Sequence, residues 1–202
     1  MSKSIINSQN VWNPEIPDGE LFYYPHFLDL NKANELFKIF KNTIPWQQDP
    51  IKVFGKTYMQ PRLTSLHSVL KNQYSYSNIT MQSKPMTEEL IYLKNKISNV
   101  YTNEFNTVLM NLYRDGKDSN GWHADNEKEL GLNPVIGSIT LGQERAFHLK
   151  HKVNKSDRLK IALEHGSLLI MSGSMQHNWL HQVPKTSRKI NERINLTYRK
   201  IF

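Results

Sequence analysis

Two histidines and an aspartate have the types and the spacing of metal ligands. His123 and Asp125 are two positions apart in GWHADNEKELG, so on an extended chain their side chains point to the same side. A third ligand follows in MQHNWLHQVP, where either His177 or His181 could supply it. Two imidazoles and one carboxylate form the facial triad of non-haem Fe(II) oxygenases, which leaves positions open for a co-substrate and oxygen. The His-x-Asp pair alone is equally compatible with an ordinary ion pair near a turn.

Polar and apolar residues alternate along the C-terminal segment RINLTYR. One face of an extended strand there carries four polar side chains: Arg193, Asn195, Thr197 and Arg199. If the opposite face joins the core, the two arginines are simply solvated. If the polar face lines a pocket, they need an anion, because a buried guanidinium without a partner is costly. A dicarboxylate would satisfy both arginines through charge-assisted hydrogen bonds.

Asn111 and Tyr113 offer further polar groups for the same ligand. They share one face of the strand-like segment VLMNLYRDG. A ferrous triad combined with a two-arginine anion pocket indicates a 2-oxo acid co-substrate.

The elements that must position these residues differ between the two halves of the chain. The first 24 or so residues indicate an arm, since the early part is polar and contains Pro14, Pro17 and Gly19. Asp29 and Thr87 can each cap a helix, and residues 51–82 indicate short strands and turns. After residue 104, at least six strand-like segments follow one another without a helix between them, which predicts a sandwich or barrel. We expect a single domain over residues 1–202, with the helices and the short strands over about 25–103.

Composition excludes several classes of protein. The chain has 202 residues and no cysteine, which rules out disulfide scaffolds, thiolate nucleophiles and iron–sulfur clusters. Its apolar runs are too short for a membrane span, and its first residues, MSKSIINSQN, lack the long apolar stretch that is typical of a signal peptide. The net charge of +8 favours partners that carry phosphate. We expect the basic segment KHKVNKSDRLK to form a solvated loop that contacts phosphate.

Several motifs together resemble the AlkB family of Fe(II)/2-oxoglutarate dioxygenases. They are NLYRDGKDSNGWHADNE, PVIGSITLG, LEHGSLLIMSG, HNWLHQVP and RINLTYRK, and the resemblance runs from about Pro25 to Lys200. It implies an α+β, mainly β fold: a double-stranded β-helix (jelly-roll) core, over about residues 104–202, with N-terminal helices and a nucleotide-recognition lid. The cofactors it implies are Fe(II), 2-oxoglutarate as co-substrate, and O₂.

The resemblance also assigns residues to the iron and the co-substrate. His123 and Asp125 match the iron ligands, and His181 matches the third because it stands just before Val-Pro. The positions of 2-oxoglutarate contacts are taken by Asn111, Tyr113, Arg193, Asn195, Thr197 and Arg199. Arg193 with Tyr113 would hold the distal carboxylate, whereas Asn111 and Arg199 would lie nearer the iron.

On the substrate side, IKVFGKTYMQPR resembles the hairpin with which duplex-acting members of the family probe the base stack. Phe54 is either a wedge between bases or a residue packed against the lid. The complete set of substrate-binding positions that we predict is Phe54, Gly55, Lys56, Arg62, Tyr74, Ser75, Tyr76, Asn126 and Glu127.

Two positions depart from the pattern of close relatives. The second acid that usually follows His-x is Asn126 here, so Glu127 would have to reach the exocyclic amine of the lesion. In PRLTSLHS, Leu66 and His67 stand where relatives often have an aromatic residue. His67 is either a base-stacking residue or a plain surface histidine.

The resemblance implies oxidative demethylation of N1-methyladenine and N3-methylcytosine in DNA, a direct-reversal repair that releases formaldehyde, succinate and CO₂. The alternatives are an AlkB-like dioxygenase acting on RNA, protein or a small molecule, and a binding module without turnover. A plain structural jelly roll gives no reason for the two in-line arginines.

We expect nucleic acid as partner, a monomer without an obligate protein partner, and no membrane association. The expected location is cytoplasmic (nucleoid-associated) or, in a eukaryote, nuclear.

Overall fold

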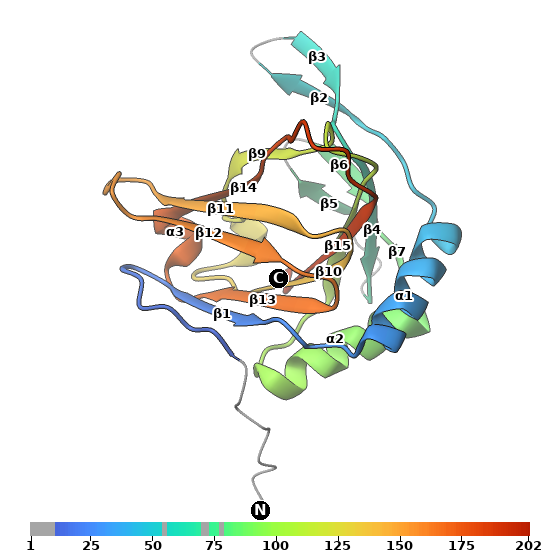
Figure 1. Ribbon diagram of the computed structural model, residues 1–202, viewed down its shortest axis with the longest axis horizontal. Coiled ribbons are helices and arrows are strands. Elements are labelled where there is room, and N and C mark those ends of the chain that lie inside the picture. The colour runs from blue at the N-terminus through green and yellow to red at the C-terminus, as the bar shows by residue number, and fades with distance from the viewer. Residues whose placement is uncertain (1–10, 54–55, 70–72, 77–78) are drawn as a thin grey trace, which may run out of the picture.

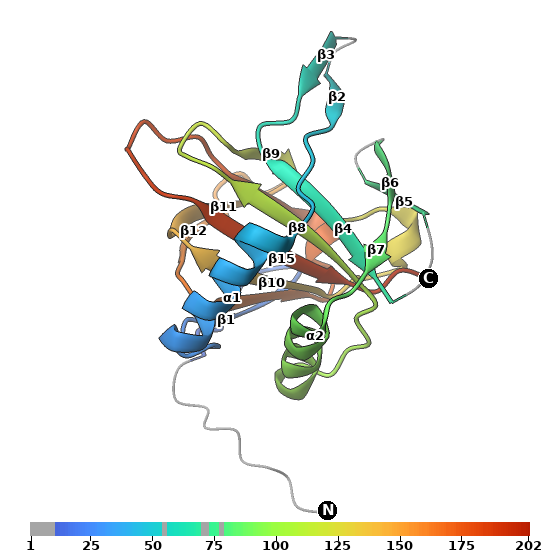
Figure 2. The same ribbon diagram turned by 90° about the vertical axis from the view of Figure 1, so that its right-hand side faces the viewer.

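The computed structural model describes residues 11–53, 56–69, 73–76 and 79–202 of the chain. Two sheets face each other, and two helices cover the outside of the larger one (Figures 1 and 2). In spatial order the larger sheet contains β1 (Glu20–Tyr24), β13 (Ser167–Ser172), β10 (Ile136–Gly142), β15 (Arg193–Arg199), β8 (Thr107–Tyr113), β4 (Leu63–Ser68) and β7 (Lys84–Pro85). The smaller sheet contains β12 (Arg158–Leu163), β11 (Arg145–His151), β14 (Trp179–Val183) and β9 (Asn120–His123).

The remaining elements lie outside these two sheets. They are α1 (Leu30–Thr43), α2 (Glu88–Val100), the short α3 (Met175–Asn178), a 3-10 turn at Lys128–Leu130, and the hairpins β2 (Pro50–Val53) with β3 (Lys56–Met59) and β5 (Gln73–Tyr76) with β6 (Ile79–Gln82). The β2–β3 hairpin projects away from the sheets (Figure 2). None of the helices in the described part of the chain is long and apolar enough to cross a membrane.

Both predicted helix starts are confirmed. The Asp29 side chain accepts a hydrogen bond from the Lys32 amide at 2.9 Å, and the Thr87 hydroxyl accepts one from the Leu90 amide at 3.4 Å. These caps satisfy amides that have no partner within the first helical turn. Each helix then buries an apolar stripe against the larger sheet, which includes Leu36 of α1.

Strand β15 is buried on both faces, and this determines where the site can be. Its residues Ile194, Leu196 and Tyr198 belong to the apolar cluster beneath α1 and α2. Its polar residues therefore face the space between the two sheets, as strand alternation requires. A second apolar cluster, including Tyr113, Phe147 and Trp179, fills part of that space. Of the two alternatives for RINLTYR, the structure selects a polar face that points inward.

The mainly β fold with N-terminal helices is confirmed, with differences in two segments. The predicted N-terminal arm includes strand β1, which pairs with β13 because Leu21 and Tyr23 alternate into the core. The segment KHKVNKSDRLK was predicted as a loop, but only its middle, residues 152–157, is a turn, and its two ends belong to the paired strands β11 and β12. Its basic residues lie largely on a sheet rather than in a loop.

The packing of α1 on the larger sheet gives a first prediction. Leu36→Ala removes a fully buried side chain from the apolar cluster and should lower the free energy of unfolding by about 2–5 kcal/mol. Lys38→Ala, at an exposed position of the same helix, should change it by less than about 0.5 kcal/mol. Urea unfolding of both variants measures the difference, and equal effects would contradict the packing described here.

Candidate metal centre and anion pocket

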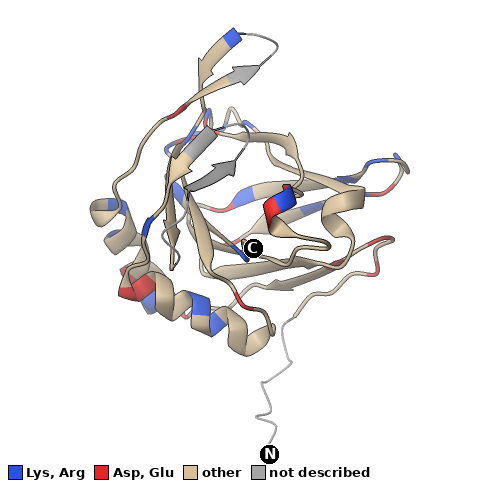
Figure 3. Ribbon diagram, turned by 180° about the vertical axis from the view of Figure 1, so that it is seen from behind, with Lys and Arg blue, Asp and Glu red and all other residues tan. Residues whose placement is uncertain are grey.

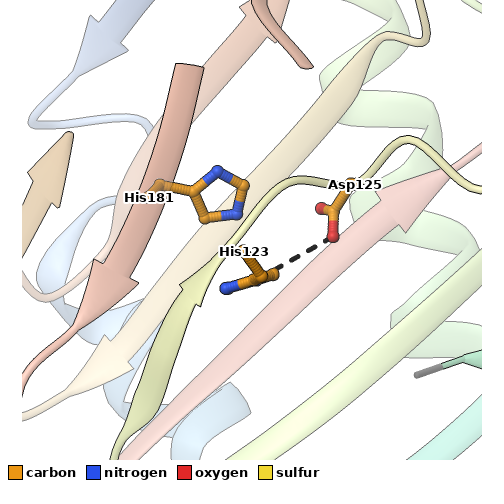
Figure 4. A group of neighbouring side chains, drawn as sticks. All are labelled: His123, Asp125 and His181. Carbon is orange, nitrogen blue, oxygen red and sulfur yellow. Dashed lines mark ion pairs between the residues drawn. The ribbon is translucent and has the colours of Figure 1, made fainter. Parts of the chain in front are cut away.

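Three side chains converge between the two sheets, as predicted. His123 ends β9 and lies opposite His181 of β14 in the strand register, and Asp125 follows two residues after β9. Their ligand atoms all lie within 4.8 Å of one another (Figure 4). His177 lies in the short helix α3, is exposed, and is not part of this group. The structure therefore selects His181 over His177 as the third member.

The carboxylate of Asp125 is buried but charged. One of its oxygens lies 2.9 Å from Nη2 of Arg199 and 3.9 Å from Nε2 of His123. Burial alone would raise the pKa of Asp125, but the Arg199 guanidinium, together with the two histidines where these are protonated, lowers it to about 2. The backbone amide of Asp125 donates to Oε1 of Gln176 at 2.9 Å, which holds the loop after β9 in place.

The two imidazoles are held in the neutral form that binds metals. Burial lowers the pKa of His181 to about 3, and burial also lowers the pKa of His123. Nδ1 of His123 lies 2.7 Å from the Gly121 carbonyl oxygen, which can only accept, so Nδ1 carries the proton. The lone pair is then on Nε2, the atom that faces Asp125. Such a second hydrogen bond is typical of metal-binding histidines because it orients the ring.

Next to the triad, the polar face of β15 lines a cavity between the two sheets. Arg193 is 1% exposed, and its Nη2 donates to the Thr140 hydroxyl at 2.9 Å. Its Nε and Nη1 atoms have no hydrogen-bond partner among the described residues. Burial lowers the pKa of Arg193 to about 10, so the side chain stays protonated at neutral pH. A buried cation with two free donors makes this cavity suited to an anion.

All six residues predicted to contact the co-substrate line this cavity: Asn111, Tyr113, Arg193, Asn195, Thr197 and Arg199. The pairing of β8 with β15 places Asn111 opposite Asn195 and Tyr113 opposite Arg193. Asn195 is held by the Ser138 hydroxyl at 2.8 Å, and it accepts from the Thr197 hydroxyl at 3.0 Å. The polar side chains of β15 are thus held in place by hydrogen bonds, and Arg193 contributes the donors that have no partner among the described residues.

The predicted substrate residues lie in several places. Arg62 is buried and donates from Nε to the Asn111 side-chain oxygen at 2.7 Å, so it touches the cavity wall. Lys56 and Asn126 are exposed, whereas Oε2 of Glu127 is buried and finds no hydrogen-bond partner in the described part of the chain. Phe54 and Gly55 lie outside the described residues, and so do the side chains of Tyr74, Ser75 and Tyr76, although their backbone forms β5.

Both alternatives considered for His67 are wrong. The side chain is neither a surface residue nor available for stacking on a base, because β4 lies inside the larger sheet and His67 is only 2% exposed. Its ring nitrogens bond to the Ser65 hydroxyl at 3.0 Å and to the Pro85 carbonyl oxygen at 2.9 Å. Alternation in PRLTSLHS gives no clear sign of this, because β4 is buried on both faces along most of its length.

Three supporting residues were missed. Gln176 holds the Asp125 backbone, and the Phe147 ring packs 5.3 Å from that of His181. Arg145 donates to the carbonyl oxygens of Asp118 and Pro184 at 2.9 and 2.7 Å, and its Cζ lies 5.6 Å from the Tyr113 ring centre. These contacts join segments far apart in the chain, so local spacing carries no signal for them.

Comparisons with known proteins agree with this fold. A family model described as the 2OG-Fe(II) oxygenase superfamily matches residues 20–199. The cattle (Bos taurus) protein alpha-ketoglutarate-dependent dioxygenase alkB homolog 3 is 41% identical over 187 residues, covering 88% of this chain and 65% of that protein. Its human (Homo sapiens) counterpart is 38% identical over 210 residues, covering 98% and 73%. The human DNA oxidative demethylase ALKBH2 is 31% identical over 181 residues, covering 85% and 69%.

The solved structure of OsALKBH1 has the same fold, with a TM-score of 0.67 at 16% identity, and the match covers 93% of this chain and 99% of that one. A facial triad between the sheets of a double-stranded β-helix defines the class, that of oxygenases dependent on Fe(II) and 2-oxoglutarate. The chain belongs to the 2OG-Fe(II) oxygenase superfamily and, within it, to the AlkB family. It spans 65–73% of the length of the relatives described above.

The triad gives a prediction for metal binding. His181→Ala removes a ligand and should weaken binding of Mn(II), a redox-stable probe, by more than the roughly 10- to 100-fold that losing an outer hydrogen bond costs. His177→Ala, four residues earlier and exposed, should leave the affinity unchanged. Isothermal titration of Mn(II) into each variant measures the dissociation constants. Equal loss in both variants would contradict the assignment.

Burial of neutral His181 also predicts how the stability of the metal-free protein depends on pH. Its pKa is about 3 in the folded chain against 6.5 ordinarily, so below pH 6.5 only the unfolded chain takes up this proton. The stabilisation is therefore complete above pH 6.5 and is lost as the pH falls toward 3. This residue should lower the free energy of unfolding by up to about 1.4 kcal/mol per pH unit in that window.

Urea unfolding between about pH 7 and pH 5 tests this dependence. His181→Gln, which cannot titrate, should show a shallower slope than the wild type, and His177→Gln should keep the wild-type slope. A wild-type slope in His181→Gln would show that the titrating group is another residue.

Proposed function

We propose that the chain is an Fe(II)/2-oxoglutarate-dependent dioxygenase that demethylates N1-methyladenine and N3-methylcytosine in DNA. The observation that carries the proposal is the buried Arg193, which has two free donors in the same cavity as the His-Asp-His triad. A metal alone would not require this cation. A 2-oxo acid with a second carboxylate accounts for both the metal ligands and the buried arginine, because one end can chelate iron and the other can pair with the guanidinium.

The residues fit this pair of cofactors. His123, Asp125 and His181 would hold the iron, since two neutral imidazoles and a charged carboxylate are the ligands that ferrous iron takes in such sites. Arg193, with the Tyr113 ring 5.1 Å from its Cζ, would hold the distal carboxylate. Arg199 keeps Asp125 ionised and therefore ready to bind metal. Asn111, fixed by Arg62, would lie nearer the iron.

When bound, iron, 2-oxoglutarate and O₂ supply the oxidation: one oxygen atom enters succinate as CO₂ leaves, and the other enters a C–H bond of the N-methyl group. The N-hydroxymethyl product then loses its hydroxyl proton and breaks the N–C bond. Formaldehyde leaves, and the electron pair of that bond returns to the ring nitrogen. The cationic ring of both lesions makes the base a good leaving group, while the protein supplies binding, orientation and a buried site.

The substrate class rests on the relatives and on charge. Relatives of this chain include proteins named DNA oxidative demethylase, and the net charge of +8 suits a phosphate backbone. Oε2 of Glu127 is buried near Asp125 and has no hydrogen-bond partner among the described residues. We assign it as the acceptor for the exocyclic amine of the lesion. Phe54, Gly55, Lys56, Tyr74, Ser75, Tyr76 and Asn126 remain predicted substrate contacts of the lid.

The test is a single-turnover demethylation. Anaerobic protein with Fe(II), 2-oxoglutarate and a DNA oligonucleotide carrying one N1-methyladenine is exposed to oxygen, and the oligonucleotide mass is read. We expect loss of one CH₂ unit and formation of succinate with the wild type and His177→Ala, and neither with His181→Ala. An RNA oligonucleotide of the same sequence runs in parallel.

The outcomes separate the levels of the proposal. Faster demethylation of the RNA oligonucleotide would move the natural substrate to RNA. Succinate formed without any change in either oligonucleotide would refute the lesion but keep the dioxygenase. Absence of both products in the wild type, with iron and 2-oxoglutarate bound, would refute the dioxygenase.

A further inference from the structure

The outer face of the smaller sheet carries cations without acidic partners. Along β11 and β12, buried residues alternate with exposed or half-exposed ones that point away from the site. The outward positions of three neighbouring strands are Ala146, His148 and Lys150 on β11, Arg158, Lys160 and Ala162 on β12, and Leu180 and Gln182 on β14. None of these residues is acidic. Figure 3 shows basic positions along the β11–β12 hairpin in blue.

The register of this sheet sets like charges opposite each other. Lys150 of β11 lies opposite Arg158 of β12, which is the like-charge pair. Lys160 lies opposite the imidazole of His148, whose pKa is lowered by burial and by Lys160 itself. Like charges directly opposite on one face destabilise a sheet unless an anion lies between or above them. Within the described part of the chain, no ion pair involves Lys150, Arg158 or Lys160. The acidic residue of the turn between these strands, Asp157, pairs with none of them; its Oδ2 accepts a hydrogen bond from the side-chain amide of Asn154 at 2.7 Å.

An exposed tryptophan completes this face next to the metal centre. Trp122 is 40% exposed on β9, and it directly precedes the triad residue His123. The ammonium of Lys150 lies 4.3 Å from the Trp122 ring centre, so the ring and the cations form one continuous surface across all four strands. At ordinary strand spacing, the width of the sheet from β9 to β12 is about 14 Å. An exposed aromatic ring beside a row of cations is the combination with which proteins hold single strands, by stacking and by phosphate contacts.

We propose that this surface, formed by Trp122, Lys150, Arg158 and Lys160, binds the single-stranded nucleic acid that flanks the reacting nucleotide. A base next to the reacting one stacks on Trp122, and the phosphates that follow lie along the three cations toward β12. The inference rests on the proposed function in one respect, that the substrate is a nucleic acid. It extends that function by placing the flanking strand on the outer sheet face, away from the lid hairpins.

The first test measures binding rather than turnover, so it does not depend on chemistry. Fluorescence anisotropy follows the full chain binding an unmethylated single-stranded DNA oligonucleotide and the matching RNA at several salt concentrations. A triple variant, Lys150→Gln, Arg158→Gln and Lys160→Gln, should raise Kd at least about tenfold at low salt and lower the slope of log Kd against log salt by about 2, since each phosphate contact contributes about 0.7.

The matched control removes the same charge from the opposite side of the molecule. The control is a second triple variant, with Lys38→Gln on α1 and with Lys94→Gln and Lys96→Gln on α2, and these two helices cover the larger sheet. This variant should keep the wild-type salt slope to within about one phosphate contact. Trp122→Ala should raise Kd about fivefold to a hundredfold, and Trp122→Phe should retain most of the affinity because a ring still stacks.

A second test locates the strand directly. The chain has no cysteine, so Gln182→Cys gives a single thiol on the outer face of the smaller sheet. We expect it to form a disulfide by exchange with a nucleotide that flanks the target base and carries a tethered mixed disulfide, which releases the small thiol, whereas Lys38→Cys should not. Circular dichroism melting confirms that each variant is folded.

The outcomes distinguish this inference from the function on which it rests. A wild type that binds neither oligonucleotide would refute both. A wild type that binds, with the two triple variants equally affected and Trp122→Ala unchanged, would refute the outer-face surface and leave the proposed function standing. Crosslinking from Lys38→Cys as strong as from Gln182→Cys would do the same.

Discussion

Strand β15 keeps two arginines in the protein interior, and the rest of the site is arranged around that constraint. Burying a guanidinium is unfavourable unless its charge and its donors are matched. Arg199 is matched by Asp125, and this pairing keeps the carboxylate ionised where two neutral imidazoles face it. Arg193 is matched only in part, by the Thr140 hydroxyl, so its remaining donors are left for a ligand. The metal centre and the anion pocket are thus two consequences of one polar strand face.

The apolar face of the same strand explains why helices far from the site matter to it. Ile194, Leu196 and Tyr198 pack beneath α1 and α2, so the helices determine which face of β15 points toward them and which face points into the cavity. A one-residue slip of this strand would bring its apolar residues into the cavity and its arginines under the helices. Antiparallel pairing with β8 and β10 on either side prevents that slip. The smaller sheet then needs to supply only His123 and His181, which its register places opposite each other.

Local patterns in the sequence were enough for the features that depend on neighbouring residues. The caps at Asp29 and Thr87 and the alternation along RINLTYR follow from turn chemistry and strand geometry. Spacing alone could not choose between His177 and His181, because the choice depends on a strand register set by distant segments. The roles of Gln176 and the burial of His67 were also out of reach, since both depend on contacts between elements far apart in the chain.

The most direct test of the central claim compares two ligands that differ only in the group that Arg193 is meant to hold. Isothermal titration of the Mn(II)-loaded protein would use 2-oxoglutarate and 2-oxovalerate, which has the same chain length but lacks the distal carboxylate. We predict that 2-oxoglutarate binds about 10- to 100-fold more tightly, as charge-assisted hydrogen bonds allow, and that Arg193→Met removes the difference. Equal affinity of the two ligands for the wild type would contradict the account.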